Sequence, residues 1–184
     1  FNSSLFLYDD MVKIQYFCVI IWASVSRLNT KIEAYSDPIL NTLITLLGMK
    51  CVIYQQDGLL ALAEMINVLK DSVLPYLPQI IDIFVLSQKS RIKEIVETSS
   101  TIILCIYHNP ELFQAIDSDI MKMIIDTLLE NCNDPNMEIT AKIQILFAMS
   151  EMVEALKADL AAFYPTFVSQ LTNFQNYLIN AKDQ

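Results

Sequence analysis

The amino-acid sequence predicts an all-α protein made of about four stacked, antiparallel helix pairs. Its 184 residues are 54% hydrophobic and only 18% charged, which implies a large buried core and is the reverse of the balance in disordered chains. It contains only two glycines, Gly48 and Gly58, whereas sheet proteins use glycine at many turns. Apolar residues also recur at helical spacing along most of the chain. Helices joined by short loops are therefore the expected structure.

The first two expected helices have different signals. Residues 9–28 are apolar nearly all round, which indicates a helix buried on more than one side, with Trp22 in the core. The second helix is expected to begin at Asp37 and Pro38, because Asp is a preferred N-cap and Pro suits the first helical position. Gly48 is its expected stop.

The next three helices follow from apolar residues at spacings of three and four. They are expected at residues 53–70, 72–86 and 91–107. Pro75 falls in the first turn of the 72–86 helix, and Pro78 either kinks that helix or shifts its start. The third of these helices ends before an Asn-Pro pair, where a helix tends to stop.

The last three helices are separated by polar turns. We expect a helix at residues 117–131, another after the turn at 133–136, and a final one at 158–178 with Pro165 near its start. The longest irregular stretch is expected at residues 108–117.

An apolar motif recurs on the even-numbered helices. Anchored on Ile44, Ile81, Ile125 and Val168, it repeats at intervals of 37, 44 and 43 residues. Such a period, with two helices per unit, is typical of HEAT repeats and favours an α-α superhelix, or HEAT-repeat solenoid. We predict one array over residues 1–184, with approximate units at 9–28 (second helix of a partial repeat), 37–70, 72–108, 117–156 and 158–180 (first helix of a partial repeat).

Composition and motifs argue against several classes of function. A net charge of −9 disfavours nucleic-acid binding. Neither glycine-rich phosphate-loop motif is present, and the single histidine, His108, has no second histidine with which to build a catalytic or zinc site. We therefore predict no enzyme activity, no cofactor and no metal. The apolar run at residues 16–25 is too short to span a bilayer, and the four cysteines lie in apolar helices, as in proteins of the cytosol or nucleus.

One segment resembles a known family. Residues 121–154 read MKMIIDTLLENCNDPNMEITAKIQILFAMSEMVE. The run resembles a repeat of the importin-β (karyopherin-β) family, in which a helix ending in LLEN precedes an Asn-rich turn and a helix containing K-x-Q-I-L. Upstream, residues 56–57, 59–69 and 74–77 are similar to the adjoining repeat. The resemblance covers about residues 9–175 and suggests the later-middle HEAT repeats of a longer receptor; the initial Phe1 also leads us to expect a fragment.

The resemblance implies a nuclear transport receptor of the cytoplasm and nucleus, found at the nuclear envelope at pores. Its partners would be basic cargo or the basic segment of an importin-α-type adaptor, Phe-Gly nucleoporin repeats, and, for the full-length receptor, Ran. Second helices of the repeats would line a concave face and first helices a convex face.

Two residue sets are candidate partner-binding sites. An acidic concave face would attract Lys- and Arg-rich segments, and its candidates are Asp57, Glu64, Glu94, Glu97, Glu138, Glu151 and Glu154. Apolar furrows between first helices would admit a Phe side chain, and their candidates are Leu40, Leu43, Leu47, Ile80, Phe84, Ile124 and Leu128. The alternatives for the two sets are solvated helix faces and plain core packing.

Two other functions stay open. Another HEAT scaffold, such as a phosphatase regulatory subunit or a vesicle-coat adaptor, would have the same fold. A helical accessory domain of an enzyme would need a catalytic constellation outside these residues. We also expect some self-association, because the ends of a helical array expose apolar faces.

Overall fold

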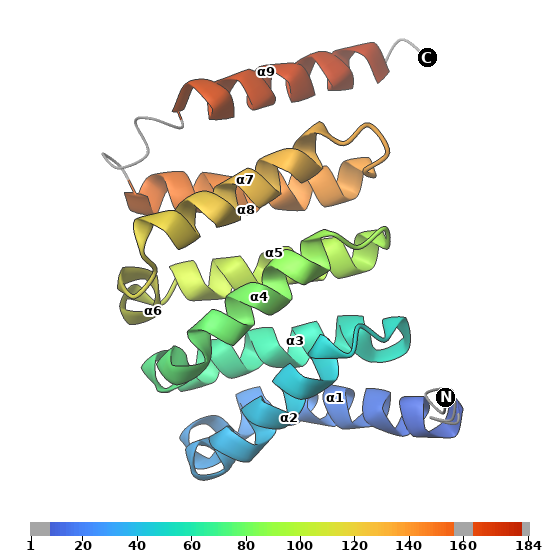
Figure 1. The fold of residues 1–184 in the computed structure, drawn as a ribbon, viewed down its shortest axis with the longest axis vertical. Coiled ribbons are helices and arrows are strands. Elements are labelled where there is room, and N and C mark those ends of the chain that lie inside the picture. Colours follow the sequence, from blue (N-terminus) through green and yellow to red (C-terminus); the bar gives the residue numbers. More distant parts are fainter. Residues whose placement is uncertain (1–7, 157–163, 182–184) are drawn as a thin grey trace.

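The computed structural model describes residues 8–156 and 164–181, and all regular structure in these ranges is helical (Figure 1). The all-α prediction is confirmed. The α-helices are α1 (Tyr8–Leu28), α2 (Ser36–Gly48), α3 (Val52–Leu69), α4 (Leu77–Gln88), α5 (Lys93–Tyr107), α6 (Pro110–Gln114), α7 (Ser118–Asn133), α8 (Ile139–Leu156) and α9 (Tyr164–Ala181). Two 3₁₀ segments, η1 (Asn29–Tyr35) and η2 (Lys70–Tyr76), precede α2 and α4.

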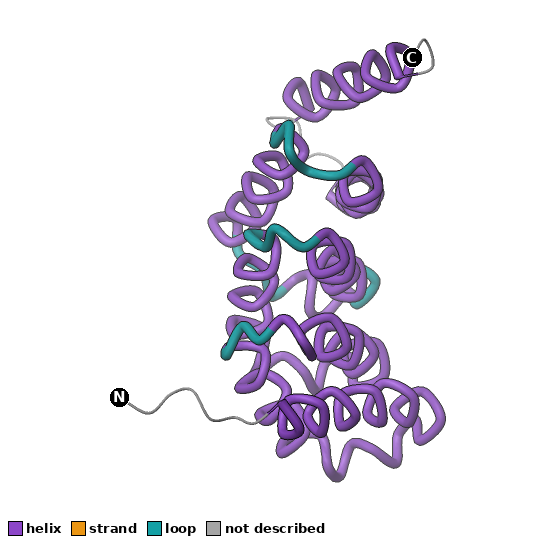
Figure 2. Tube along the Cα trace, turned by 90° about the vertical axis from the view of Figure 1, so that its right-hand side faces the viewer, coloured by secondary structure: helices purple, strands orange, loops and turns teal. Residues whose placement is uncertain are grey.

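The long helices form two layers that advance in chain order from one end of the molecule to the other (Figures 1 and 2). Layer A contains α2, α4 and α7, layer B contains α1, α3, α5 and α8, and α9 lies across the end of the stack, where it contacts α7. Within layer B, α3 packs on α1 and α5, and α5 packs on α3 and α8. Each helix thus contacts its neighbours in the row, and the two chain ends lie at opposite ends of the stack.

The core lies between the layers and runs through the stack as one cluster of apolar side chains. Phe84 of α4 and Ile106 of α5 are completely buried in it. Burying a side chain of this size contributes about 2–3 kcal/mol through the hydrophobic effect. Gly58 in α3 marks a close approach of helices, since a Cβ there would lie 2.9 Å from Cδ2 of Leu47. The core therefore fixes the spacing of the layers as well as their stability.

The starts of α2 and α4 differ from their expected positions. The prediction that Asp37 caps the second helix is wrong, because α2 begins at Ser36 and its N-cap is Tyr35. The carboxylate of Asp37 instead accepts a hydrogen bond of 3.0 Å from the Tyr76 hydroxyl, which ties η2 to α2. Of the two alternatives for Pro78, the structure shows the shifted start, since α4 begins at Leu77 with Pro78 in its first turn.

The stretch expected to be irregular contains the short helix α6. Asn109 caps it, because its side-chain oxygen accepts hydrogen bonds from the backbone N–H groups of Glu111 and Leu112. Leu112 then inserts into the core with no exposed surface. The cap, Leu112 and the packing of Phe113 on the Tyr107 ring thus hold in place a helix that is too short to show a hydrophobic period.

The two ends of the stack give different outcomes. The prediction that Trp22 lies in the core is wrong, because its side chain is 46% exposed on α1. In layer B, α1 has α3 on one side and no described helix on the other. The last helix, expected at residues 158–178, is seen as α9 from Tyr164. Residues 157–163 lie outside the described part of the chain.

Candidate protein-binding surfaces

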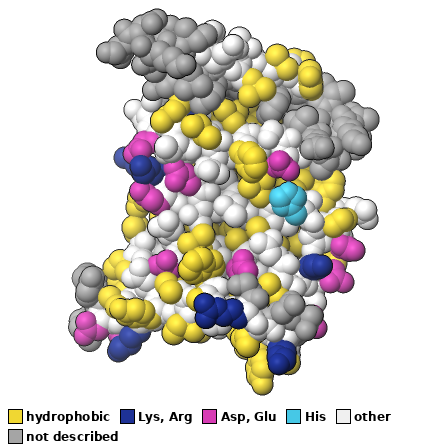
Figure 3. Space-filling model, turned by 180° about the vertical axis from the view of Figure 1, so that it is seen from behind, with side chains coloured by type: hydrophobic (Ala, Val, Ile, Leu, Met, Phe, Trp, Pro, Cys, Tyr) yellow, Lys and Arg dark blue, Asp and Glu magenta, His cyan; other side chains and the backbone are white. Residues whose placement is uncertain are grey.

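The acidic residues singled out in the sequence share the face of layer B. Asp57 and Glu64 lie in α3, Glu94 and Glu97 in α5, and Glu151 in α8, while Glu138 directly precedes α8. Glu154 also lies in α8, but its side chain is outside the described part of the structure. Figure 3 shows this face of the molecule, where acidic side chains form separate groups divided by hydrophobic and uncharged ones. The face is acidic in patches and is not a continuous acidic wall.

One group of carboxylates gathers around a lysine at the start of α5. Lys93 Nζ lies 3.0 Å from a carboxylate oxygen of Glu138, which joins the N-terminal ends of α5 and α8. The hydrogen bond to Glu138 and the charges of Glu138, Glu94 and Glu97 raise the pKa of Lys93. We call these four residues the Lys93 cluster. Because it holds three carboxylates and one ammonium, it keeps an excess of negative charge.

Glu97 is the least satisfied member of the Lys93 cluster. Its Oε1 atom is buried and has no hydrogen-bond partner. A buried carboxylate oxygen without a donor pays a desolvation penalty of about 1–3 kcal/mol, more when the group is charged. Because Glu97 as a whole is only partly buried, its carboxylate can rotate toward solvent, where an incoming Lys or Arg side chain would donate to it and remove that penalty.

The remaining acidic side chains lie outside the Lys93 cluster and contact other residues. Asp57 accepts a hydrogen bond of 2.8 Å from Gln15 Nε2, which links α3 to α1. Glu151 lies 3.4 Å from His108 Nε2, which links α8 to the C-terminal end of α5. Glu64 is close enough to Cys105 for its charge to raise the pKa of that thiol. The sequence assigned these residues to one set of helices, which form layer B. The different contacts that each residue makes could not be predicted from the sequence.

The seven residues expected to line convex furrows are in the core. Each is 3% exposed or less, so none offers an accessible surface to a partner, and the expectation of accessible lining residues is corrected. The apolar face of a helix packs against the other layer and does not face solvent, because that contact removes its apolar surface from water. The corrected residues are Leu40, Leu43, Leu47, Ile80, Phe84, Ile124 and Leu128.

A shallow hollow does exist between α4 and α7 on layer A, with a volume of about 390 Å³. Its apolar surface comes from Val85 and Met123, of which Met123 is 38% exposed. Its polar rim is acidic by one charge and consists of Asp119, Asp126, Glu130, Lys89 and Lys122. An exposed methionine within a rim of mixed charge suits a small apolar side chain of a partner.

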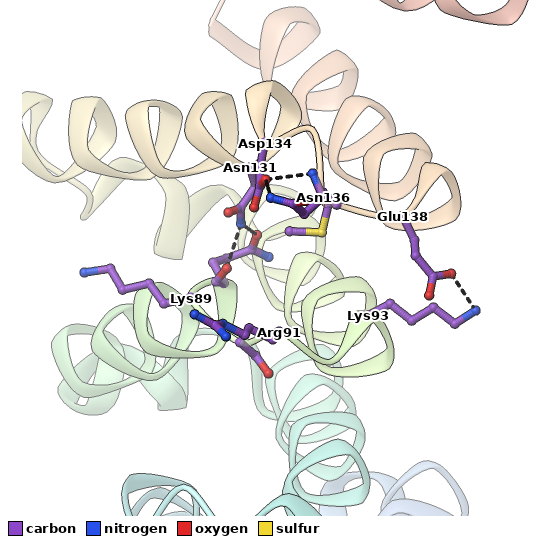
Figure 4. Close-up of a pocket in the computed structure, with 10 residues that line it drawn as sticks. Lys89, Arg91, Lys93, Asn131, Asp134, Asn136 and Glu138 are labelled. Atoms are coloured by element: carbon purple, nitrogen blue, oxygen red, sulfur yellow. Dashed lines mark hydrogen bonds and ion pairs between the residues drawn. The ribbon is translucent and has the colours of Figure 1, made fainter.

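A larger pocket, with a volume of about 590 Å³, lies between the α4–α5 and α7–α8 connections (Figure 4). Gln88 and Asn131, which sequence reasoning did not single out, are among the residues that line it. Asn131 Nδ2 donates to the backbone oxygen of Gln88 at 2.8 Å and to its side-chain oxygen at 2.6 Å. The Gln88 amide is completely buried and donates to Ser99, Ser100 and the Val96 carbonyl. This network locks α4, α5 and α7 together.

The described residues bear on metal binding, thiol chemistry and membrane insertion. Across residues 8–156 and 164–181, no three His, Cys, Asp or Glu side chains gather in a way that would hold a metal ion. Burial raises the pKa of the Cys105 thiol to about 11 and that of the Cys132 thiol to about 12, so both are protonated near neutral pH. No helix in the described part combines the length and apolar character that crossing a membrane requires.

Comparison of the chain with protein-family models, curated proteins and solved structures finds no match in any of the three. What the fold and the surfaces define is thus an all-α protein of two helical layers, with separate acidic groups on the face of layer B.

Proposed function

We propose that this chain is a HEAT-repeat solenoid and a protein-binding scaffold, similar to part of an importin-β-like nuclear transport receptor. The support is the two-layer row itself, in which successive helix pairs bury their apolar faces only against the next pair. The resemblance of residues 121–154 to an importin-β repeat agrees with this arrangement, since the two helices of that segment are the adjacent α7 and α8.

The face of layer B binds Lys- or Arg-rich segments of other proteins. The observation that carries this proposal is the Lys93 cluster, with its buried Glu97 oxygen that lacks a donor. A basic side chain would donate to the Glu97 carboxylate, once that side chain rotates toward solvent, and to Glu94, while Lys93 stays paired with Glu138. The remaining acidic groups on α3 and α8 raise the rate of encounter with a positively charged segment.

Direct binding of a labelled Lys- and Arg-rich peptide tests this function. Replacing Glu64, Glu94 and Glu97 together by Gln should weaken binding about tenfold, because charge pairs near the surface contribute about 0.2–1 kcal/mol each and all three glutamates are only partly buried. The matched control replaces three exposed acids that lie outside layer B and outside both pockets, Glu33→Gln, Asp71→Asn and Asp82→Asn, and makes the same change in net charge.

The control separates site binding from general attraction to an acidic protein. We expect the control variant to bind the peptide almost as well as the unmodified chain, and added salt to weaken binding in both. Equal losses in the two variants would show that the peptide senses only net charge, and the layer B site would then be rejected.

Layer A is the proposed docking face for Phe-Gly nucleoporin repeats, at the hollow between α4 and α7. A Phe ring would rest on Val85 and Met123, and Met123→Glu should abolish binding of a Phe-Gly peptide by placing a charge on the apolar surface. Retained Phe-Gly binding in that variant would contradict this docking site. Failure of the unmodified chain to bind Phe-Gly peptides would favour another HEAT scaffold, such as a phosphatase regulatory subunit or a vesicle-coat adaptor.

A further inference from the structure

Helix α1 carries one row of exposed side chains along the side that faces away from α3. On the opposite side, Cys18 and Val25 are completely buried. All members of the row are exposed, and they follow one another at steps of four, three, four, three and four residues, which is one face of a helix. The exposed row consists of Asp9, Lys13, Tyr16, Ile20, Ala23 and Arg27.

The centre of the exposed row is strongly apolar. Tyr16 is 65% exposed and Ile20 is 62% exposed, and Phe17 lies beside them at the edge of the row. Scattered single apolar residues on a surface are ordinary, but a contiguous set flanked by charges at both ends is typical of a contact surface. In layer B no described helix covers this side of α1.

The exposed row is complementary to a second copy of itself that runs in the opposite direction. Reading outward from Cys18, Tyr16 on one side matches Ile20 on the other, Lys13 matches Ala23, and Asp9 matches Arg27. Two copies of α1 laid antiparallel across a two-fold axis near Cys18 would therefore oppose Tyr16 to Ile20 twice and Asp9 to Arg27 twice. Antiparallel helices also oppose their dipoles favourably. An isologous pair of this kind closes on itself and stops at two copies.

We propose that the exposed row of α1 is a self-association surface, through which two copies of this chain pair antiparallel as a weak dimer. Lys13 does not compete for Asp9, because its ammonium lies 3.1 Å from the Asp10 carboxylate. The Lys13 stem then lies over Ala23 of the second copy, where a small side chain leaves room for it.

Head-to-tail stacking of copies is the main alternative, and charge disfavours it. In this arrangement, α1 of one copy would pack on α8 of the next copy and continue layer B from one copy to the next. All helices of layer B run parallel, as the contacts of Lys93 with Glu138 and of His108 with Glu151 show for α5 and α8. An added α1 would then place Asp9 and Asp10 near Glu138, where like charges repel.

The contact is small, which sets the expected affinity. A helix of this length presents a strip roughly 30 Å long and about 10 Å wide, and two such strips bury about 600 Å² in total. Stable dimers bury at least about 1,200 Å². The dimer should accordingly be reversible, with a dissociation constant between micromolar and millimolar.

Sedimentation equilibrium of the 184-residue chain over a wide concentration range tests the proposal. We expect a monomer–dimer equilibrium with no larger species. Asp9→Arg or Arg27→Asp alone should weaken the dimer about tenfold, since each creates two repulsive pairs, and the two changes together should restore it to within about threefold of the unmodified chain. Ile20→Glu should abolish the dimer.

The changed side chains are exposed, so the variants should keep the fold, which circular dichroism verifies. Phe147→Glu is the control at the other end of the stack, because Phe147 is an exposed residue of α8, and it should leave the dimer unchanged. The proposal is overturned by a monomer at every concentration, by growth beyond dimers, by failure of the double charge exchange to restore pairing, or by loss of pairing in Phe147→Glu.

Discussion

Helices α1 and α3 belong to the same layer and have similar apolar content, yet their side chains have different fates. In α3, Leu59, Leu62 and Ile66 are completely buried, because α1 and α5 cover its two sides and layer A covers a third. In α1, Tyr16 and Ile20 are exposed, because only α3 and the adjoining segments pack on it. The apolar pattern of a helix therefore indicates which side chains can be buried. In a row of helices, the number of neighbouring helices decides whether those side chains are buried.

The largest expected effect compares two isoleucines. Ile66→Ala in α3 should lower the free energy of unfolding by about 2–5 kcal/mol, because it leaves a cavity at a position with no exposed surface. Ile20→Ala in α1 should change it by no more than about 0.5 kcal/mol, as expected for a surface site. Urea unfolding followed by circular dichroism, at a concentration too low for dimers, measures both.

If Ile20→Ala were as destabilising as Ile66→Ala, the end helix would be covered in solution, and the contrast between α1 and α3 would fail. A dependence of the Ile20→Ala effect on protein concentration would instead link that coverage to the α1–α1 contact.

The second effect is a loss of stability in alkaline solution. It should involve both α5, in the middle of the stack, and the buried side of α1, at the end of the stack. Burial raises the pKa of the thiols of Cys105 in α5 and Cys18 in α1 from 9.0 to about 11. Since the unfolded thiols ionise near pH 9 and the folded ones near pH 11, the folded state holds its protons longer. Stability should be constant below about pH 9 and fall between about pH 9 and 11, by about 2–3 kcal/mol for Cys105 alone.

Thermal unfolding between neutral and alkaline pH measures this loss, with Cys105→Ala and Cys18→Ala as the two arms. Each substitution should flatten the alkaline slope. An unchanged slope in Cys18→Ala alone would mean that the inner side of α1 opens to water, unlike the middle of the stack.

The third effect contrasts two glutamines that link neighbouring helices. Gln88→Leu should cost about 1–3 kcal/mol, because Gln88 is completely buried and its loss leaves the side-chain amide of Asn131 short of one acceptor. Gln15→Leu, at the partly exposed link from α1 to α3, should cost below about 1 kcal/mol. Chemical denaturation measures the loss of stability in both variants. Equal losses would contradict the expectation that α1, at the end of the stack, is held less tightly than the helices in the middle.

The smallest effect concerns the ion pair between α5 and α8. Glu138→Gln removes the partner of Lys93, and both side chains are more than a third exposed, so we expect no loss of stability that chemical denaturation can resolve. The same variant should lower the pKa of Lys93, which nuclear magnetic resonance of the labelled ammonium group can follow. A loss as large as that of Gln88→Leu would indicate that the Lys93 cluster is much less accessible to water than its exposure implies.

Much of the fold followed from local sequence. The helical spacing of apolar residues predicted α3, α5, α7 and α8 close to their observed bounds, and Asp117 caps α7 by accepting from the Ile120 N–H at 2.8 Å. The spacing of three between Glu94 and Glu97 also put these carboxylates on one face of α5. Gln88 and Asn131 carried a weaker signal, since they stand 43 residues apart, close to the interval of the apolar motif. Apart from this interval, the sequence does not indicate that an uncharged polar residue at a helix end is buried.

What the sequence by itself determined is the set of helices and the side chains that each can offer to a core, because both depend on contacts within a few residues along one helix. Tertiary structure alone decided that Trp22 and Tyr16 meet solvent, that Leu40 and Phe84 do not, and that Glu138 joins Glu94 and Glu97 around Lys93. The physical reason is that burial and charge pairing depend on which helix lies alongside and in what register, and residues far apart in the chain set both.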